Sequence, residues 1–326
     1  MAQATAPASP FVSVITVNWN GQRFLEKLLP ILEEQDYPRA YYEIIVLDND
    51  STRDDSVAYI SEHFPNVRLI KNTRNDGFAR GNNLAMREAK GEYFVLINND
   101  TLPHTNWLST LVNCAETETN AGAVVSKVLF AHRGEGTIIN NAGSLLYPNK
   151  AWPVEEIGAN QQDGPAFNTR REVTAVSGTS LLLKRAMLAQ IGLFDESFFM
   201  YWEDSDLSWR GQNAGWKFYY EPTSIVLHEH SGSSTEHSDF WTFYVTRNRL
   251  LLLWKHARFG LALRAYLSFV KEFLFTPIVN GLLGRQRRHQ LHQLKLWLKI
   301  DASFSLRLWP MLLKRLHILS ERKVSA

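Results

Sequence analysis

The stretch YFVLINNDTLP, residues 93–103, indicates the fold class of this 326-residue chain. Its first five residues are apolar, as in a buried β-strand, and Asn98, Asn99 and Asp100 follow at once. In open α/β sheets, ligands bind beyond the carboxyl ends of the strands. The position of Asp100 therefore predicts a functional site after this strand, although a turn without chemistry would give the same pattern.

Segments before this stretch repeat the pattern. Apolar strands are predicted at residues 11–17, 42–47 and 67–71, and amphipathic helices at 23–34, 54–63 and 82–89. Strands and helices that alternate at this spacing predict an α/β fold with a doubly wound, mostly parallel sheet. Asn18, Asp48, Asp50 and Asp100 all follow such strands, so we expect them at one edge of the sheet.

The chain changes character further on. We expect strands at 124–130 and 173–184, a short helix at 185–191 and Gly-, Pro- and Asn-rich loops at 140–165. Long apolar and basic helices follow from about residue 240. We therefore divide the chain into a disordered lead-in at 1–10, an α/β domain at 11–245 and a basic amphipathic helical region at 246–326.

Charge is distributed unevenly between these parts. Residues 247–326 contain sixteen Lys and Arg and three Asp and Glu. Residues 1–246 contain nineteen Lys and Arg and thirty Asp and Glu. A basic end on an acidic body predicts an anionic partner for that end. Nucleic acid is a poor candidate because no recognition motif accompanies the charge.

Cysteine use and hydropathy bear on the compartment. The single cysteine, Cys114, cannot form a disulfide within the chain, which favours a reducing compartment. The first ten residues lack the basic start and apolar core of a signal peptide. Residues 259–283 are interrupted by Arg264, Lys271 and Glu272, so no membrane-spanning helix is predicted. We expect a cytoplasmic protein.

Two early motifs suit a nucleotide. Asp48 and Asp50 can accept hydrogen bonds from a nucleobase and a ribose, but taken alone they are more often part of an Asx turn with a helix cap. In NDGFARGNN, residues 75–83, Gly77 and Gly81 permit close approach of the backbone and Arg80 can meet a phosphate. A plain loop that leads into a helix remains the alternative.

Two later motifs suit catalysis and metal binding. FFMYWEDSDLSWR, residues 198–210, places Glu203, Asp204 and Asp206 among aromatic residues, and burial there would raise a carboxyl pKa toward that of a general base. A capped amphipathic helix is the alternative. The strand end SIVLHEHSGSS, residues 224–234, offers His228 or His230 to join Asp100 around a divalent cation.

Taken in order, these motifs resemble the family-2 inverting glycosyltransferases of the GT-A fold over about residues 11–250. The similarity is carried by VSVITVNWNG, IIVLDNDSTRDDS, NDGFARGNNLAMREAKGEYFVLINNDT, SGTSLLLKRAMLAQIGLFDESFFMYWEDSDLSWR and HEHSGSS. The chain is most similar to the rhamnosyltransferase-like branch that builds bacterial surface polysaccharides. The resemblance implies an enzyme that moves a sugar, such as rhamnose, from a nucleoside-diphosphate sugar to a hydroxyl of a glycan or lipid-linked acceptor.

The resemblance also implies roles for individual residues. Asp204, with Glu203 beside it, matches the general base, and Asp100 with His228 matches the site of Mg²⁺ or Mn²⁺. The Asp-x-Asp metal motif of the family begins here with Asn98, so the metal depends more on Asp100, on His228 and on the donor diphosphate. The donor pocket corresponds to Thr16, Asn18, Asp48, Asp50, Gly77, Arg80, Asn98 and Asn99. Acceptor or diphosphate contacts are expected from Gly178, Trp202, Asp206, His230 and Arg247.

The basic helices suggest a peripheral position on the inner face of the plasma membrane. Basic amphipathic helices that carry Trp254, Trp297 and Trp309 suit the headgroup region and anionic lipids. We expect one face of a helix near the end of the chain to carry Leu291, Leu294, Trp297 and Leu298, with Lys295 and Lys299 beside it. Packing on the α/β domain or on a second subunit is the alternative. A sugar nucleotidyltransferase and a non-catalytic sugar-nucleotide or glycan-binding relative are the competing functions.

Overall fold

The computed structural model describes residues 9–229, 238–275 and 287–324. Within it the chain forms two compact units, here called the sheet unit and the helical unit. The sheet unit is assembled from Met1–Leu146, Glu155–Glu196 and Asp204–Ser233. The helical unit is assembled from Tyr147–Val154, Ser197–Glu203 and Ser234–Ala326, so two short segments join it from the middle of the chain.

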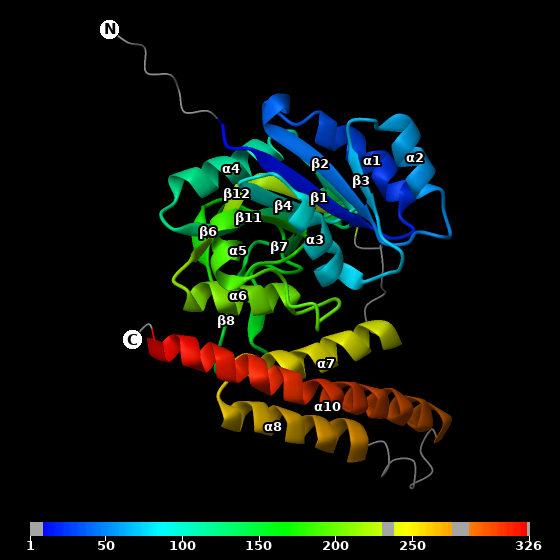
Figure 1. Cartoon of the computed structure of the whole chain (residues 1–326), viewed down its shortest axis with the longest axis vertical. Coiled ribbons are helices and arrows are strands. Elements are labelled where there is room, and N and C mark those ends of the chain that lie inside the picture. The colour runs from blue at the N-terminus through cyan, green and yellow to red at the C-terminus, as the bar shows by residue number, and fades with distance from the viewer. Residues whose placement is uncertain (1–8, 230–237, 276–286, 325–326) are drawn as a thin grey trace. The chain divides into compact units, whose positions relative to one another are not determined.

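One large sheet forms the centre of the sheet unit (Figure 1). Its strands are β1 Val12–Asn18, β2 Tyr42–Asp48, β3 Arg68–Lys71, β4 Tyr93–Ile97, β5 Thr101–Pro103, β6 Ala121–Phe130, β7 Ile139–Asn141, β10 Arg171–Val173, β11 Ser180–Lys184 and β12 Lys217–His228. Their order is β10-β12-β6-β11-β4-β1-β2-β3, with β5 beside β12 and β7 beside β6. Two further strands, β8 Ser144–Leu146 and β9 Val154–Glu156, pair with each other.

The direction of the strands changes across the sheet. Strands β3, β2, β1 and β4 are parallel, as the alternating pattern predicts. Strand β11 then runs antiparallel to both β4 and β6, and β6 pairs in parallel with β12. The carboxyl ends of β1, β2 and β4 therefore meet at one edge, where the sequence places its polar residues.

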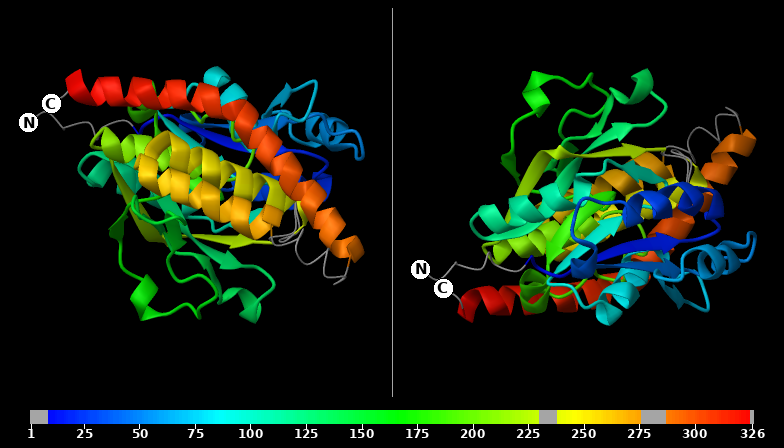
Figure 2. Two further views of the ribbon diagram at one scale, coloured as in Figure 1. Left: turned by 90° about the horizontal axis from the view of Figure 1, so that it is seen from below. Right: turned by 90° about the horizontal axis from the view of Figure 1, so that it is seen from above.

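Each face of the sheet is covered by helices (Figure 2). One core contains apolar residues of α1 Gln22–Glu33, α2 Ser56–His63 and α4 Trp107–Thr117, and the other contains residues of α3 Gly77–Glu88, α5 Arg185–Ile191 and α6 Glu203–Asn213. Helix α3 begins five residues before its predicted start at Asn82, so the glycine-rich stretch is helical. A Cβ on Gly81 would lie 3.1 Å from Val17 and 3.2 Å from Leu47, so Gly81 lets α3 approach the sheet.

The helical unit contains α7 Asp239–His256, α8 Phe259–Phe269, the π-helical turn η4 Val270–Phe275 and α10 Arg287–Val324. Helix α10 packs along α7, and α8 also contacts α7. The ring of Trp254 lies 5.5 Å from that of Phe259, and the ring of Trp297 lies 6.2 Å from that of Phe269. Among the described residues, no helix combines the length and apolarity needed to span a bilayer.

Two expectations for this unit are wrong. Trp254 and Trp297 are only 7% and 8% exposed, so they belong to its aromatic core and cannot reach lipid headgroups, whereas Trp309 is 69% exposed. Leu298 is 52% exposed and therefore does not share the buried face of Trp297. Apolar residues occur on several sides of α10, so periodicity alone does not reveal which side is the core.

Candidate functional site

Three strand ends are joined by the side chain of Asn18 at the end of β1. Its Nδ2 donates to Asp48 Oδ1 at 3.1 Å and to Ser51 Oγ at 3.2 Å, and its Oδ1 accepts from Asn99 Nδ2 at 2.9 Å. Asn18 is fully buried. A Cβ on Gly21 would lie 2.4 Å from Asn99, so the loop after β1 requires glycine for this arrangement.

The residues after β2 form a turn at the same edge. Asp48 is 2% exposed and accepts a hydrogen bond from the backbone N–H of Ser51 at 3.0 Å, while Asp50 has a φ of 66° and is partly buried. This is the Asx-type turn that was the alternative to a nucleotide contact, although it leaves Asp50 accessible. Thr16, on β1 two residues before Asn18, is 1% exposed, and its hydroxyl lacks a hydrogen-bond partner among the described residues.

A network of asparagines was not anticipated from the sequence. Asn49 Nδ2 donates to Asn75 Oδ1 and to the carbonyl of Gly77, both at 3.1 Å, and Asn72 Nδ2 donates to Asn49 Oδ1 at 3.0 Å. Gly77, with a φ of 75°, begins α3. The turn after β2 is thereby tied to the NDGF stretch, and repeated Asn at strand ends was the only available signal.

Arg80 is already engaged by carboxylates. Its guanidinium lies 3.2 Å from Asp76 and 3.8 Å from Glu196, and its side chain is 42% exposed. Burial alone would raise the pKa of Asp76, but hydrogen bonds from Asn72 and Arg74 and the charge of Arg80 hold that pKa below its usual value. The positive charge that Arg80 can offer to a phosphate is therefore partly neutralised within the protein.

Asp100 and His228 face each other. Asp100 follows β4, His228 ends β12, and Asp100 Oδ1 lies 3.3 Å from His228 Nε2. His228 Nδ1 lies 3.1 Å from Asn140 Oδ1, which orients the ring. A carboxylate oxygen and an imidazole nitrogen suit a divalent cation such as Mn²⁺. No group of three or more His, Cys, Asp and Glu is found among the described residues.

A turn connects this strand end to Asp204. The backbone N–H of Asn98 donates to the carbonyl of Thr179 at 3.0 Å, and the N–H of Gly178 donates to Asp204 Oδ2 at 3.2 Å. Asp204 Oδ1 also accepts from the backbone N–H of Ser205 at 2.7 Å. Gly178 has no room for a Cβ, which would lie 2.7 Å from the ring of Phe78.

The environment of Asp204 suits proton acceptance. Protein atoms that displace water raise the pKa of its carboxyl, and the hydrogen bonds from Gly178 and Ser205 oppose part of this effect. The carboxyl therefore has a fixed direction and a raised proton affinity. Those two properties are required of a general base near neutral pH.

Most of the remaining predicted site residues are buried or bound to other protein groups. Asp206 is fully buried in an ion pair with Arg210 at 2.9 Å, so it cannot contact an acceptor. Glu203 is 5% exposed, and Trp202 stacks on Trp152 with ring centroids 5.5 Å apart. Arg247 is 3% exposed, which argues against direct contact with a diphosphate. The prediction for His230 lies outside the described residues.

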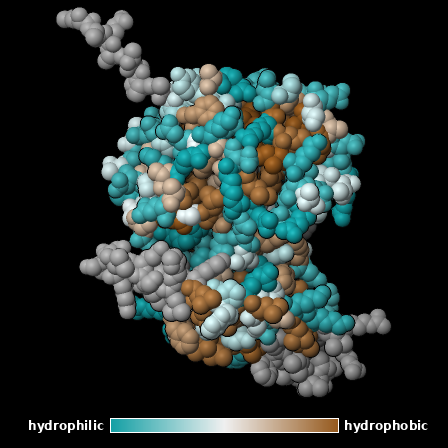
Figure 3. Space-filling view, in the orientation of Figure 1, coloured by the Kyte–Doolittle hydropathy of each residue, from teal (hydrophilic) through white to brown (hydrophobic). Residues whose placement is uncertain are grey.

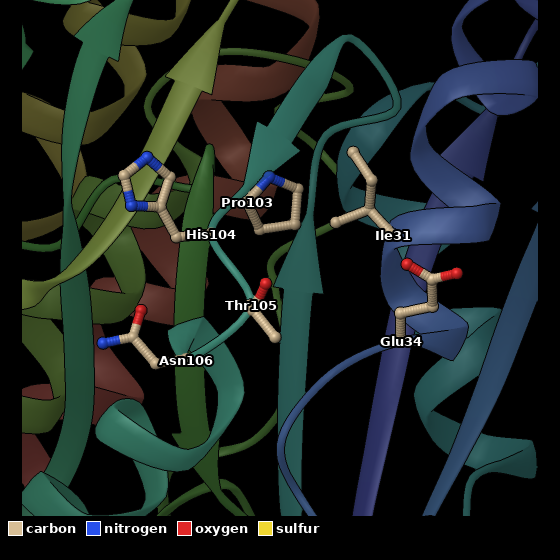
Figure 4. A pocket seen from close by; sticks show the side chains of 6 residues that line it. All are labelled: Ile31, Glu34, Pro103, His104, Thr105 and Asn106. Carbon is tan, nitrogen blue, oxygen red and sulfur yellow. The ribbon is translucent and has the colours of Figure 1, made fainter.

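A separate surface hollow lies beside α1 and the loop after β5 (Figure 4). It is lined by Ile31, Glu34, Pro103, His104, Thr105 and Asn106. None of the candidate site residues lines it, so it does not bear on the chemistry of the strand ends.

The curled sheet with helices on both faces and polar residues at its strand ends is a GT-A glycosyltransferase fold. GalNAc-T7 in complex with UDP, GalNAc and Mn²⁺ has a TM-score of 0.58 at 16% identity, over 76% of this chain and 48% of that one. The mannosyltransferase PcManGT of Pyrobaculum calidifontis, in complex with GDP-Man and Mn²⁺, has a TM-score of 0.52 at 19% identity, over 93% and 88%.

Residues 13–191 match the family glycosyl transferase family 2, and the chain belongs to that family. The N-acetylglucosaminyl-diphospho-decaprenol L-rhamnosyltransferase of Mycobacterium tuberculosis is 27% identical over 76% of this chain and 87% of that protein. Rhamnosyltransferase WbbL of Escherichia coli is 25% identical over 74% and 94%. The O-antigen biosynthesis protein RfbC of Myxococcus xanthus is 27% identical over 72% of this chain, which spans only 19% of RfbC. The resemblance seen in the motifs is thus confirmed.

Proposed function

We propose that this chain is an inverting glycosyltransferase that moves a sugar from a nucleoside-diphosphate sugar to a hydroxyl of a glycan or lipid-linked saccharide. The observation that carries the proposal is Asp204, whose carboxyl has a raised pKa and is held by Gly178 on the turn that contacts Asn98. The names of two relatives favour rhamnose as the sugar, and the name of the O-antigen biosynthesis protein RfbC favours surface polysaccharide synthesis as the pathway class.

In this proposal, Asp204 accepts the proton of the acceptor hydroxyl while that oxygen attacks the anomeric carbon of the donor sugar. The bond from that carbon to the diphosphate breaks in the same step, so the anomeric centre inverts and a nucleoside diphosphate leaves. Asp50 and the neighbouring strand ends would bind the nucleoside. The step requires no covalent enzyme intermediate.

The donor set at Asp100 and His228 fits Mn²⁺ or Mg²⁺, and these two residues would hold the ion. A bound divalent cation supplies positive charge that stabilises a departing diphosphate. Asn98 contributes no negative charge where the family motif begins with an aspartate. With two protein ligands, we expect the ion to bind weakly unless the donor phosphates are also present.

The activity is tested by measuring nucleoside diphosphate release from a panel of nucleotide sugars, with an extracted lipid-linked saccharide as acceptor. Release that requires both substrates supports the proposal, and the preferred donor identifies the sugar. Tight binding of a nucleotide sugar without turnover on any acceptor would instead indicate a non-catalytic sugar-nucleotide-binding relative.

We also propose that the helical unit docks on a lipid surface. Exposed large apolar side chains are present on both α8 and α10, and Figure 3 shows hydrophobic surface on this unit. On α10, Leu298, Leu306, Trp309 and Leu313 recur at helical spacing and are 51–79% exposed. Lys295 and Lys299 are exposed on the same helix, so apolar contact combines with charge complementary to anionic lipids.

Replacing Leu306 and Trp309 together by Glu should weaken binding to vesicles that contain anionic lipid by at least about tenfold. Burying each such side chain stabilises by about 1.5–3 kcal/mol, and the two new charges repel the lipid. Vesicle co-sedimentation measures the effect, and Asn113→Asp on the exposed side of α4 is the control. Unchanged vesicle binding would contradict the proposal. A dimer that the double variant dissociates would assign the surface to a second copy of the chain.

A further inference from the structure

The segment immediately before α6 has an unusual backbone. Phe199, Tyr201 and Trp202 have φ values of 66°, 69° and 72°, in the left-handed region. Residues with a Cβ rarely adopt this conformation because the Cβ approaches the following carbonyl oxygen. Three such residues within a few positions persist only where other contacts hold the chain in place.

Asn248 of α7 provides one set of these contacts. Its Nδ2 lies 2.7 Å from the carbonyl oxygen of Phe198 and 2.8 Å from those of Met200 and Tyr201. The residue is fully buried. A single amide group therefore binds carbonyls on both sides of the left-handed Phe199.

Arg247 provides the second set. Its Nη2 donates to the carbonyls of Ser197 at 3.1 Å and Phe198 at 2.9 Å, and its Nε donates to Asn248 Oδ1 at 2.8 Å. The last bond fixes the orientation of the Asn248 amide, so that its N–H groups point to the segment. The guanidinium also lies 4.8 Å from the ring centroid of Tyr244, which stacks on Phe199.

Burial makes this arrangement costly. Desolvation, with a contribution from the nearby charge of Arg307, lowers the pKa of Arg247 to about 10, so the group is still a cation at neutral pH. A buried cation bound to backbone carbonyls is a poor candidate for ligand binding. Its bonds are better explained by a requirement for one backbone conformation in residues 197–202.

We propose that Arg247 and Asn248 are positioning residues for sugar transfer, because they hold residues 197–202 in the left-handed conformation from which α6 and Asp204 follow. The inference rests on the role of Asp204 in the proposed function. In this proposal neither residue touches a substrate. Both act through residues 197–202, which immediately precede Glu203 and Asp204.

The test replaces Asn248 by Asp, which keeps the size of the side chain but removes both N–H donors. We expect kcat to fall about tenfold or more, with the donor KM within about twofold of the wild-type value, because binding of the nucleotide is left intact. Chymotrypsin should cleave within residues 198–202 about tenfold faster, since these aromatic residues open more often. Asn113→Asp, the same change at an exposed helical position, should alter neither quantity.

A second variant separates backbone positioning from general loss of stability. Tyr201→Gly in the Asn248→Asp background should restore part of kcat, because glycine adopts a positive φ without steric cost. Absence of recovery would overturn the proposal, as would wild-type kcat and cleavage in Asn248→Asp. If the wild-type enzyme turns over no nucleotide sugar, the proposed function fails, and the cleavage rates alone decide whether Asn248 holds the segment.

Discussion

Asp204→Asn is expected to lower turnover by about 10²-fold or more while leaving the affinity for the nucleotide-sugar donor within about twofold. The amide cannot accept the proton of the acceptor hydroxyl, but its single oxygen can still receive one of the two backbone N–H groups, of Gly178 and Ser205, that the carboxylate accepts in the native protein. The size of the side chain and one of these bonds are kept while the proton acceptor is lost. A loss confined to kcat is the signature of an interaction that acts in the transition state.

The measurement compares nucleoside diphosphate release with calorimetric binding of the donor. Asp36→Asn, at an exposed carboxylate of the sheet unit, is the matched control and should behave as wild type. Turnover of Asp204→Asn at the wild-type rate would remove Asp204 from the role of base.

The raised pKa of Asp204 also sets the direction of two pH effects. As a base, Asp204 works when deprotonated, so kcat should rise with pH through that raised pKa. The stability of the fold changes with pH in the opposite direction. The folded state binds the proton of Asp204 more tightly than the unfolded chain does. The protonated carboxyl therefore stabilises the fold fully below the pKa of Asp204 in the unfolded chain, and this stabilisation is lost as the pH rises through its pKa in the folded protein. Asp204→Asn should therefore melt at a higher temperature than wild type near neutral pH.

Asp100→Ala is expected to remove the part of nucleoside diphosphate binding that depends on Mn²⁺. Asp100 and His228 are the protein groups that fit the ion, and Asp100 supplies the carboxyl oxygen of the pair. Loss of a ligand should cost at least the roughly 10- to 100-fold in metal affinity that follows loss of an outer-shell partner.

Calorimetric titration of the nucleoside diphosphate with and without Mn²⁺ measures this effect. Wild type should bind more tightly with the ion, whereas Asp100→Ala should bind equally in both conditions, and Asp36→Ala should resemble wild type. Wild-type binding that is the same with and without the ion would exclude a metal at Asp100 and His228.

Much of the fold could be predicted from local pattern. Strand β4 occupies the predicted residues 93–97, and β1, β2 and β3 each begin or end within one residue of prediction. Apolar runs of this length report buried strands wherever they occur, since the reason is local. Strand β11 was predicted as part of a longer strand at 173–184, but the turn at Ser177–Thr179 separates it from β10. That turn reaches Asp204, a contact that the local sequence does not reveal.

By itself, the sequence determined the family, the alternation of strands and helices, and the placement of Asn18, Asp48 and Asp100 at strand ends, because period and order are properties of the chain. Only the tertiary structure decided which of these side chains meet. His228 faces Asp100 because β12 pairs with β5, the strand that directly follows Asp100.

The helical unit shows the same division. Sequence indicated long basic helices, but it did not show that Trp297 is buried and Trp309 exposed, nor that Arg247 binds backbone carbonyls. An apolar or charged side chain has the same identity on either side of a helix. Its role depends on which neighbour the folded chain brings against it, and that neighbour is distant in the sequence.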